Sequence, residues 1–316
     1  MKKSIKVILG SMAALTAAGT GVLIYCYNLA FRRDDKRLPK EGSAPTGEQY
    51  DPFKEVIEKG ANNILSASYE KVSITSRDGI LLAGRYYHVK DGAPISIIFH
   101  GYRSTIGTDC NGGYSMSVRR GYNVLVVYQR AHRESGGKTI TFGVKERFDC
   151  LDWIAYVNKR FGDDTPILLM GLSMGAATVL MAAGLELPSN VKGVMADCGF
   201  SSPKEILQEV IKQKKYPLRI TYFFVRMSAR IFGHFDPEEA SAVEALKTAK
   251  VPVLIIHGDD DRFVPSRMSH DNYEACASAK EILVVPGAGH GLSYCVDAKA
   301  YEKAVEDFMD KVLEES

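Results

Sequence analysis

The chain has 316 residues, of which 46% are apolar and 25% are charged, which is ordinary for a globular protein. Its formal net charge is only +2, so no strong electrostatic field draws it to nucleic acid, and we exclude nucleic-acid binding. The six cysteines are scattered and form no Cys-x-x-Cys pair, which argues against a zinc site and against a disulfide framework.

The first 31 residues are predicted to form a membrane anchor. Lys2, Lys3 and Lys6 precede a stretch from Val7 to Phe31 that contains no charged residue. As a helix this stretch would be roughly 37 Å long, enough to cross a hydrocarbon core of ~30 Å. A cleaved signal peptide is the alternative, but further apolar residues follow the small ones, which favours an uncleaved single-pass anchor in the cell membrane. Basic residues flank both ends, so the side of the membrane that the remaining chain occupies stays open.

Residues 32–50 are charged and contain proline and glycine, which predicts a linker. Residues 51–316 are predicted to form one domain, because short β-rich runs alternate in it with longer helical runs. That pattern indicates βαβ units and a mostly parallel eight-stranded sheet flanked by helices. Residues 201–248 contain no good strand and are predicted to be a helical insertion, or lid, over one edge of the sheet. The expected strands are 71–76, 81–88, 95–99, 123–128, 167–170, 193–196, 253–256 and 282–285.

The strongest chemical signal is the run Gly171-Leu172-Ser173-Met174-Gly175. It follows an apolar strand and precedes an alanine-rich helical run, which is the context that a Gly-x-Ser-x-Gly nucleophile requires. Glycines flank the serine because side chains would collide in the strained turn that presents its hydroxyl. Ser173 is therefore the predicted nucleophile.

A serine hydroxyl is a weak nucleophile and needs a base, which in turn needs a carboxylate to fix its tautomer. His290, on a glycine-rich loop after the last expected strand, is the predicted base. Asp261 is the predicted carboxylate; Asp259 and Asp260 compete with it by position but suit turn formation better. The chain order of serine, aspartate and histidine is typical of one particular hydrolase fold.

A tetrahedral oxyanion needs backbone donors. One predicted donor is the N–H of Met174, directly after the nucleophile. The other is the N–H of Tyr102, in the loop after the strand 95–99, where Gly101 lets the backbone approach a substrate closely.

With these motifs, residues 69–312 resemble the α/β-hydrolase superfamily, and within it the branch that contains lysophospholipase-like and serine-aminopeptidase-like enzymes. The resemblance also rests on His100-Gly101, on the turn at 129–135, and on the run at 257–265. It implies hydrolysis of an ester, thioester or amide through an acyl-enzyme, with no metal and no cofactor. Relatives usually carry glycine where this chain has Arg133, which either stays solvated or binds an anionic group.

The expected function is hydrolysis of lipidic or small acyl esters, since the anchor would hold the enzyme beside lipid. A peptidase or aminopeptidase-like amide hydrolase is one alternative. A non-catalytic membrane binding protein with the same fold is the other. The expected partners are an ester substrate and the membrane, and the sequence leaves the oligomeric state and the natural substrate open.

Overall fold

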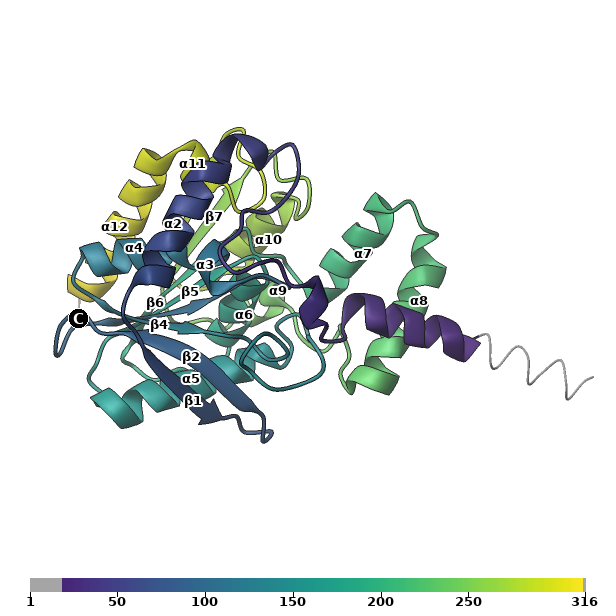
Figure 1. The fold of residues 1–316 in the computed structure, drawn as a ribbon, viewed down its shortest axis with the longest axis horizontal. Helices are drawn as coiled ribbons and strands as arrows, with labels where there is room; N and C mark the ends of the chain where they lie inside the picture. The colour runs from purple at the N-terminus through teal and green to yellow at the C-terminus, as the bar shows by residue number, and fades with distance from the viewer. Residues whose placement is uncertain (1–18, 315–316) are drawn as a thin grey trace, which may run out of the picture.

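The computed structural model describes residues 19–314, which fold around a single eight-stranded sheet (Figure 1). The strand order is β1-β2-β4-β3-β5-β6-β7-β8. The pairs β1–β2 and β2–β4 are antiparallel, and every other neighbouring pair is parallel. The strands are β1 (Glu70–Thr75), β2 (Leu81–Tyr87), β3 (Ile95–Phe99), β4 (Asn123–Val127), β5 (Ile167–Leu172), β6 (Val191–Asp197), β7 (Val253–Gly258) and β8 (Lys280–Val285).

All eight predicted strands are confirmed, with ends shifted by a few residues at most. The central strands were recognisable because both of their faces are buried, so apolar residues occupy successive positions. In β3 and in β4 every residue is buried. β1, at the edge of the sheet, is mostly exposed, whereas its neighbour β2 is largely buried and does not show the alternation expected of an edge strand.

Alternate residues of each strand enter two separate apolar cores. Leu125 and Val127 of β4 belong to one core, and Val124 and Val126 belong to the other. Helices α5 and α6 pack in the first core, whereas α4 and α12 pack in the second (Figure 1). Besides the helix over residues 19–30, the α-helices outside residues 201–248 are α2 (Lys54–Ser66), α3 (Ile106–Asp109), α4 (Asn111–Arg119), α5 (Glu146–Phe161), α6 (Met174–Ala183), α10 (Arg267–Ala275), α11 (Ser293–Val296) and α12 (Ala298–Glu314).

The segment 201–248 is helical and contains no strand. Its elements are α7 (Pro203–Gln213), α8 (Leu218–Ser228), a five-residue π-helix η3 (Ala229–Gly233) and α9 (Ala242–Leu246). Figure 1 shows α7 and α8 projecting away from the sheet on the side of the first residues described.

The predicted membrane span lies partly outside the described residues, since it begins at Val7. Its described part is helical over residues 19–30, and Phe31 directly after it is fully buried. The ring of Phe31 packs edge-on against Phe142 and Phe235. Within residues 19–314, no helix combines the length and the apolar character needed to cross a membrane.

The predicted linker is packed against the domain. The Arg33 guanidinium donates to the carbonyl oxygens of Arg133 and Ser135 at 2.5 and 2.6 Å. Glu41 accepts the N–H of Gly107 at 2.9 Å, in the first turn of α3. This segment is therefore held against the turn that follows β4 and against the start of α3.

Candidate active site

The three predicted catalytic side chains stand at one edge of the sheet. Ser173 directly follows β5, Asp261 follows β7, and His290 follows β8. Parallel strands bring their carboxyl ends to the same edge, so three loops that are distant in sequence converge there. The register supports this, because Phe99 at the end of β3 pairs with Gly171 near the end of β5.

Ser173 occupies a strained turn between β5 and α6. Its φ is 56° and its ψ is −113°, values that a residue with a side chain rarely adopts. Such strain costs about 1–3 kcal/mol and is typical of functional sites. A side chain at Gly175 is impossible without rearrangement, because its Cβ would lie 2.0 Å from the carbonyl oxygen of Phe99. The turn can therefore pass this close to β3 only with glycine there.

The structure brings Ser173, His290 and Asp261 into one hydrogen-bonded line. The Nε2 atom of His290 is 2.9 Å from the Oγ atom of Ser173, and its Nδ1 atom is 2.7 Å from Oδ2 of Asp261. The other oxygen of Asp261 accepts the backbone N–H groups of Phe263 and Val264, both at 2.8 Å. With Nδ1–H donating to the carboxylate, Nε2 is free to accept the hydroxyl proton of Ser173.

The charges of the site reinforce this arrangement. Burial opposes ionisation of Asp261, but the adjacent His290 and His257 outweigh it and hold the pKa of its carboxyl well below the usual range. Burial also disfavours the imidazolium of His290, yet the Asp261 carboxylate outweighs that effect and raises the pKa of His290. The side chain of Asp261 has no exposed surface, so solvent screens this attraction little.

The two segments that carry the predicted oxyanion donors lie close to the nucleophile. Met174 is the first residue of α6, so its N–H lies at the positive end of that helix. Gly101, next to Tyr102, lies so close to the nucleophile that a Cβ there would be 3.3 Å from Cβ of Ser173. The Gly101 N–H donates to half-buried Asp109 at 2.7 Å, a contact that no pattern in the sequence indicated. Asp109 thereby fixes the direction of the loop that carries Tyr102.

Two buried histidines hold the same loop. His100 accepts the N–H of Gln129 on Nε2, at 3.1 Å, and donates from Nδ1 to the carbonyl of Gly101, at 2.8 Å. His132 likewise accepts the N–H of Arg103 at 3.0 Å. Burial lowers the pKa of His100 to about 4, so it stays neutral and keeps this pattern at ordinary pH. His100 thus has the structural role that a His-Gly pair at a strand end suggests.

His257 also has structural contacts, but they reach the triad. Its Nε2 atom is 3.1 Å from Oδ2 of Asp261 and 2.9 Å from the carbonyl oxygen of Val264. Its Nδ1 atom is 2.6 Å from Oγ of Ser269, in α10. The sequence pattern did not predict the contact between His257 and Asp261. A histidine at the end of a strand, four residues before an aspartate in the following loop, is common and carries no such signal.

The predicted linker contributes residues to the edge of the site. The Oε1 atom of Gln49 lies against Gly289, next to His290, since a Cβ on Gly289 would be 2.3 Å from it. Burial, together with nearby Cys198 and Asp261, raises the pKa of the Tyr50 hydroxyl. No sequence signal marked these residues, because their position depends on the path of the whole preceding segment.

Arg133 neither stays solvated nor reaches an anionic group in the site. It donates to the carbonyl of Pro39, and its Nε atom is 3.8 Å from a carboxylate oxygen of Glu41. Its φ of 46° is in the region that favours glycine, the residue expected there from the resemblance. The arginine therefore fastens the segment 32–50 to the turn at 129–135.

Among residues 19–314, the side chains placed to share a metal ion are Cys198, Asp261 and His290. Both ring nitrogens of His290 are already hydrogen-bonded, to Ser173 and to Asp261. Burial raises the pKa of the Cys198 thiol well above its usual value. The donor set suits the hydrogen-bonded line described above and not a metal.

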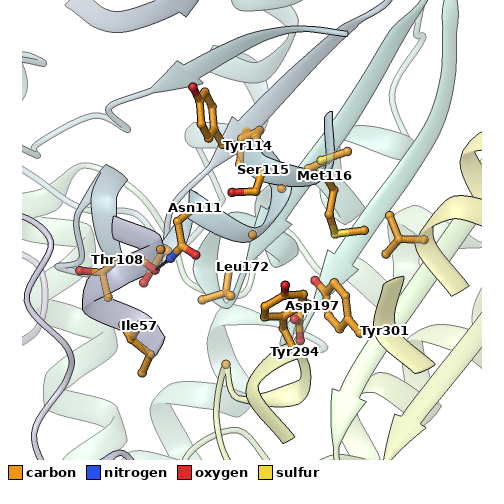
Figure 2. A pocket seen from close by; sticks show the side chains of 18 of the residues that line it. Ile57, Thr108, Asn111, Tyr114, Ser115, Met116, Leu172, Asp197, Tyr294 and Tyr301 are labelled. Carbon is orange, nitrogen blue, oxygen red and sulfur yellow. Dashed lines mark hydrogen bonds between the residues drawn. The ribbon is translucent and has the colours of Figure 1, made fainter. Parts of the chain in front are cut away.

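A cavity of about 680 Å³ lies beside the triad on the face of the sheet covered by α2, α4 and α12. Figure 2 shows Leu172, Asp197 and Tyr301 among the side chains in its wall. None of the three triad side chains lines it, although Leu172 and Gly291 are their neighbours in sequence. Burial raises the pKa of Asp197 to about 6. Because its wall includes Gly171 and Leu172 but none of the triad side chains, the cavity borders the end of β5 and not the Ser173 hydroxyl.

Sequence comparison finds a family and several relatives. A sequence profile of the prolyl oligopeptidase family matches residues 120–316. The uncharacterized Bacillus subtilis protein YqkD is 26% identical over 314 residues, with 97% of this chain and 98% of that protein covered. Lysophosphatidylserine lipase ABHD12 of Xenopus tropicalis is 24% identical, and the match covers 60% of this chain and 48% of that protein.

Solved structures give the same fold. The Pyrococcus furiosus esterase Pf2001 superposes with a TM-score of 0.66 at 23% identity, covering 79% of this chain and 94% of the esterase. Est1E of Butyrivibrio proteoclasticus, solved with ferulic acid, gives 0.58 at 21% identity, covering 78% of this chain and all (100%) of Est1E. Together with the family match, these likenesses confirm the α/β-hydrolase fold, with its mostly parallel eight-stranded sheet between helices.

Proposed function

The chain belongs to the prolyl oligopeptidase family, and from that premise we propose that it is a serine hydrolase that cleaves carboxylic esters through an acyl-enzyme. The observation that carries the proposal is the line of two hydrogen bonds, of 2.7 and 2.9 Å, from Asp261 through His290 to Ser173. A buried carboxylate, an imidazole and a serine on a strained turn in this order are the components of acyl transfer.

In the proposed mechanism, the Oγ atom of Ser173 attacks the carbonyl carbon of the ester while Nε2 of His290 takes its proton. The N–H groups of Met174 and Tyr102 hold the oxyanion, and each such donor contributes about 3–4 kcal/mol to the transition state. His290 then protonates the leaving alkoxide. A water molecule, deprotonated by His290, releases the acid and restores Ser173.

An ester with an apolar acyl chain is the substrate class that we favour. The segment 201–248 is rich in apolar residues and contacts the loop after Asp261 through Gln213, and the name of the Xenopus tropicalis relative, a lysophosphatidylserine lipase, points to lipidic esters. Amide hydrolysis is the second candidate. It is favoured by the family description and by likeness to an acylaminoacyl peptidase of Pyrococcus horikoshii, with a TM-score of 0.55.

The test is labelling by a fluorophosphonate probe, followed by activity assays. The protein should be labelled, Ser173→Ala should not be, and Ser189→Ala, which removes an exposed serine elsewhere, should be labelled normally. Hydrolysis of p-nitrophenyl esters of rising chain length should exceed that of aminoacyl arylamides. Preference for the arylamides would favour the peptidase alternative, and absence of labelling would favour a non-catalytic binding protein.

We also propose that residues 1–31 attach the protein to the cell membrane. The support is the uncharged sequence from Val7 to Phe31. The full chain should float with phospholipid vesicles in a density gradient. A chain that stays at the bottom of the gradient would contradict this attachment without affecting the hydrolase proposal.

A further inference from the structure

Helix α8 has an apolar face that points away from the protein. Tyr222 and Val225 lie on its buried face. On the opposite face, Ile220 is 64% exposed and Phe223 is 58% exposed. The two residues are three positions apart, so they lie on the same side of the helix. A surface helix ordinarily turns charged and polar residues to water, whereas this one also exposes two large apolar side chains.

The helix over residues 19–30 extends this exposed face. Tyr27 packs against Phe232, in η3 directly after α8, with ring centroids 5.8 Å apart. Figure 1 shows this helix, in purple, beside the green helices of the segment 201–248 at the projecting end of the molecule. Among its exposed apolar residues, Val22, Tyr25 and Leu29 are three and four positions apart and so lie on one side of the helix. We call the combined set the projecting surface, and its residues are Val22, Tyr25, Leu29, Ile220 and Phe223.

Basic residues border the projecting surface. Lys214 and Lys215 lie in the turn between α7 and α8, and Arg219 lies beside Ile220; all three are exposed. Near an anionic membrane each such residue contributes about 1 kcal/mol of attraction. Apolar side chains inside a basic rim are the pattern of a helix that lies in the headgroup region of a bilayer.

The sequence before residue 19 also indicates that a lipid bilayer is the partner of the projecting surface. Residues 7–18 carry no charge and directly precede the helix that contributes Val22, Tyr25 and Leu29. We propose that the projecting surface rests on an anionic phospholipid bilayer, with Ile220 and Phe223 inserted among the lipid headgroups. This inference rests on the proposed membrane attachment by residues 1–31 and adds a lipid contact by α8. An experiment can contradict either proposal without contradicting the other.

The contact would bring the bilayer close to the triad. At the end of α7, Gln213 donates to the carbonyl oxygens of Arg262 and Phe263, at 2.9 and 3.2 Å. The ring of Phe263 in turn packs on that of His290, with centroids 5.1 Å apart. The helical segment therefore connects the bilayer to the catalytic loops.

The test uses an introduced tryptophan as a local probe in the full chain. The native Trp153 is only 1% exposed in the core and gives a constant background. Phe223→Trp is compared with Val56→Trp, an exposed apolar position on α2, in vesicles of phosphatidylcholine and phosphatidylglycerol that contain brominated lipid. We expect bromine to quench the Phe223→Trp protein and to shift its emission to the blue, while the Val56→Trp protein stays unquenched.

A Phe223→Trp protein that floats with vesicles but stays unquenched would overturn the inference and leave the anchor intact. A blue shift without vesicles that grows with protein concentration would also overturn it, and would indicate a second copy of the chain. Ile220→Glu combined with Phe223→Glu should slow hydrolysis of a vesicle-borne ester several-fold and leave p-nitrophenyl acetate hydrolysis unchanged. Val56→Glu should change neither rate, and equal slowing of both rates would contradict a lipid-contact role.

Discussion

His257 and His290 converge on one oxygen of Asp261. The Nε2 atom of His257 lies 3.1 Å from Oδ2, and Nδ1 of His290 lies 2.7 Å from the same atom. Backbone N–H groups occupy the other oxygen. The carboxylate is thus held from several directions and cannot rotate away from His290 without breaking other bonds. We infer that His257 positions the carboxylate on which the base depends.

Replacing His257 with glutamine should therefore lower catalysis. A hydrogen bond to a charged group contributes about 1.5–3 kcal/mol, so a loss of about tenfold or more is expected. The loss should appear in kcat and not in KM, because His257 is completely buried and cannot touch substrate. Kinetics on p-nitrophenyl acetate measure both constants. His270→Gln, at an exposed position of α10, is the control. A fall in stability with unchanged kcat would show that His257 only packs the core.

In the pH profile of kcat/KM, the acid limb should have a higher apparent pKa than an ordinary histidine would give. Only neutral His290 can accept the Ser173 proton, and the Asp261 carboxylate raises the pKa of that imidazole. Protonation therefore persists to higher pH, and activity should rise with pH through a pKa above the usual value of about 6.5 and then level off. An acid limb at or below that value would mean that Asp261 does not stabilise the imidazolium.

Asp261→Asn should lower kcat by about 10⁴-fold, because an amide stabilises neither the correct tautomer nor the imidazolium. Asp260 provides a matched control in the adjacent position, since it is exposed and pairs with Arg262 at 3.0 Å. Asp260→Asn should retain nearly full activity in the same kinetic assay. The reverse result would assign the catalytic carboxylate to Asp260.

Gly175 is required for the turn that presents the nucleophile. A methyl group there would lie 2.0 Å from the Phe99 carbonyl oxygen, so Gly175→Ala must displace β3 or α6. We expect a loss of about 1–3 kcal/mol in the free energy of unfolding, with catalysis lost as well. Gly112→Ala, in α4 with open space around it, should instead be neutral or gain about 0.5–1 kcal/mol. Urea denaturation measures both variants, and equal stabilities would contradict the close approach.

Local sequence patterns predicted the parts of the molecule that depend on local physics. Strands buried on both faces carry runs of apolar residues, so β3 to β7 were recognisable. The turn at Ser173 needs glycines on both sides, so the nucleophile was recognisable too. The expectation that the loops after β5, β7 and β8 meet follows from parallel strands alone. The helical nature of residues 201–248 followed from the absence of alternation.

Local sequence patterns could not predict contacts between distant segments of the chain. Asp109 holds Gly101, and Gln49 lies against Gly289, but nothing near either residue in the sequence signals its partner. The charged, proline-containing segment 32–50 was predicted to be a linker because its composition lacks a core face. Its arginines and Glu41 instead bond to backbone groups of the domain, and a composition argument does not count such bonds.

Phe31 should control whether this N-terminal segment stays docked. Its ring is fully buried between Phe142 and Phe235, and a buried phenylalanine contributes about 3–5 kcal/mol relative to alanine. Phe31→Ala should therefore release the segment and not unfold the sheet, because Phe142 and Phe235 lie in loops and not in strands. Hydrogen exchange at the amides of Arg33 and Ile140, which bond across this junction, should accelerate.

Release of the N-terminal segment should also loosen the loop that carries Tyr102. The hydroxyl of Tyr102 donates to the carbonyl oxygen of Ala30 at 2.8 Å, so undocking removes a restraint from the residue whose N–H is proposed to hold the oxyanion. Phe31→Ala should then lower kcat modestly, whereas Leu29→Ala, at a position that is 49% exposed, should change neither exchange nor kcat. Faster exchange with an unchanged kcat would show that the bonds of Asp109, His100 and His132 to Gly101 and Arg103 are enough to hold the loop, since they do not involve the N-terminal segment.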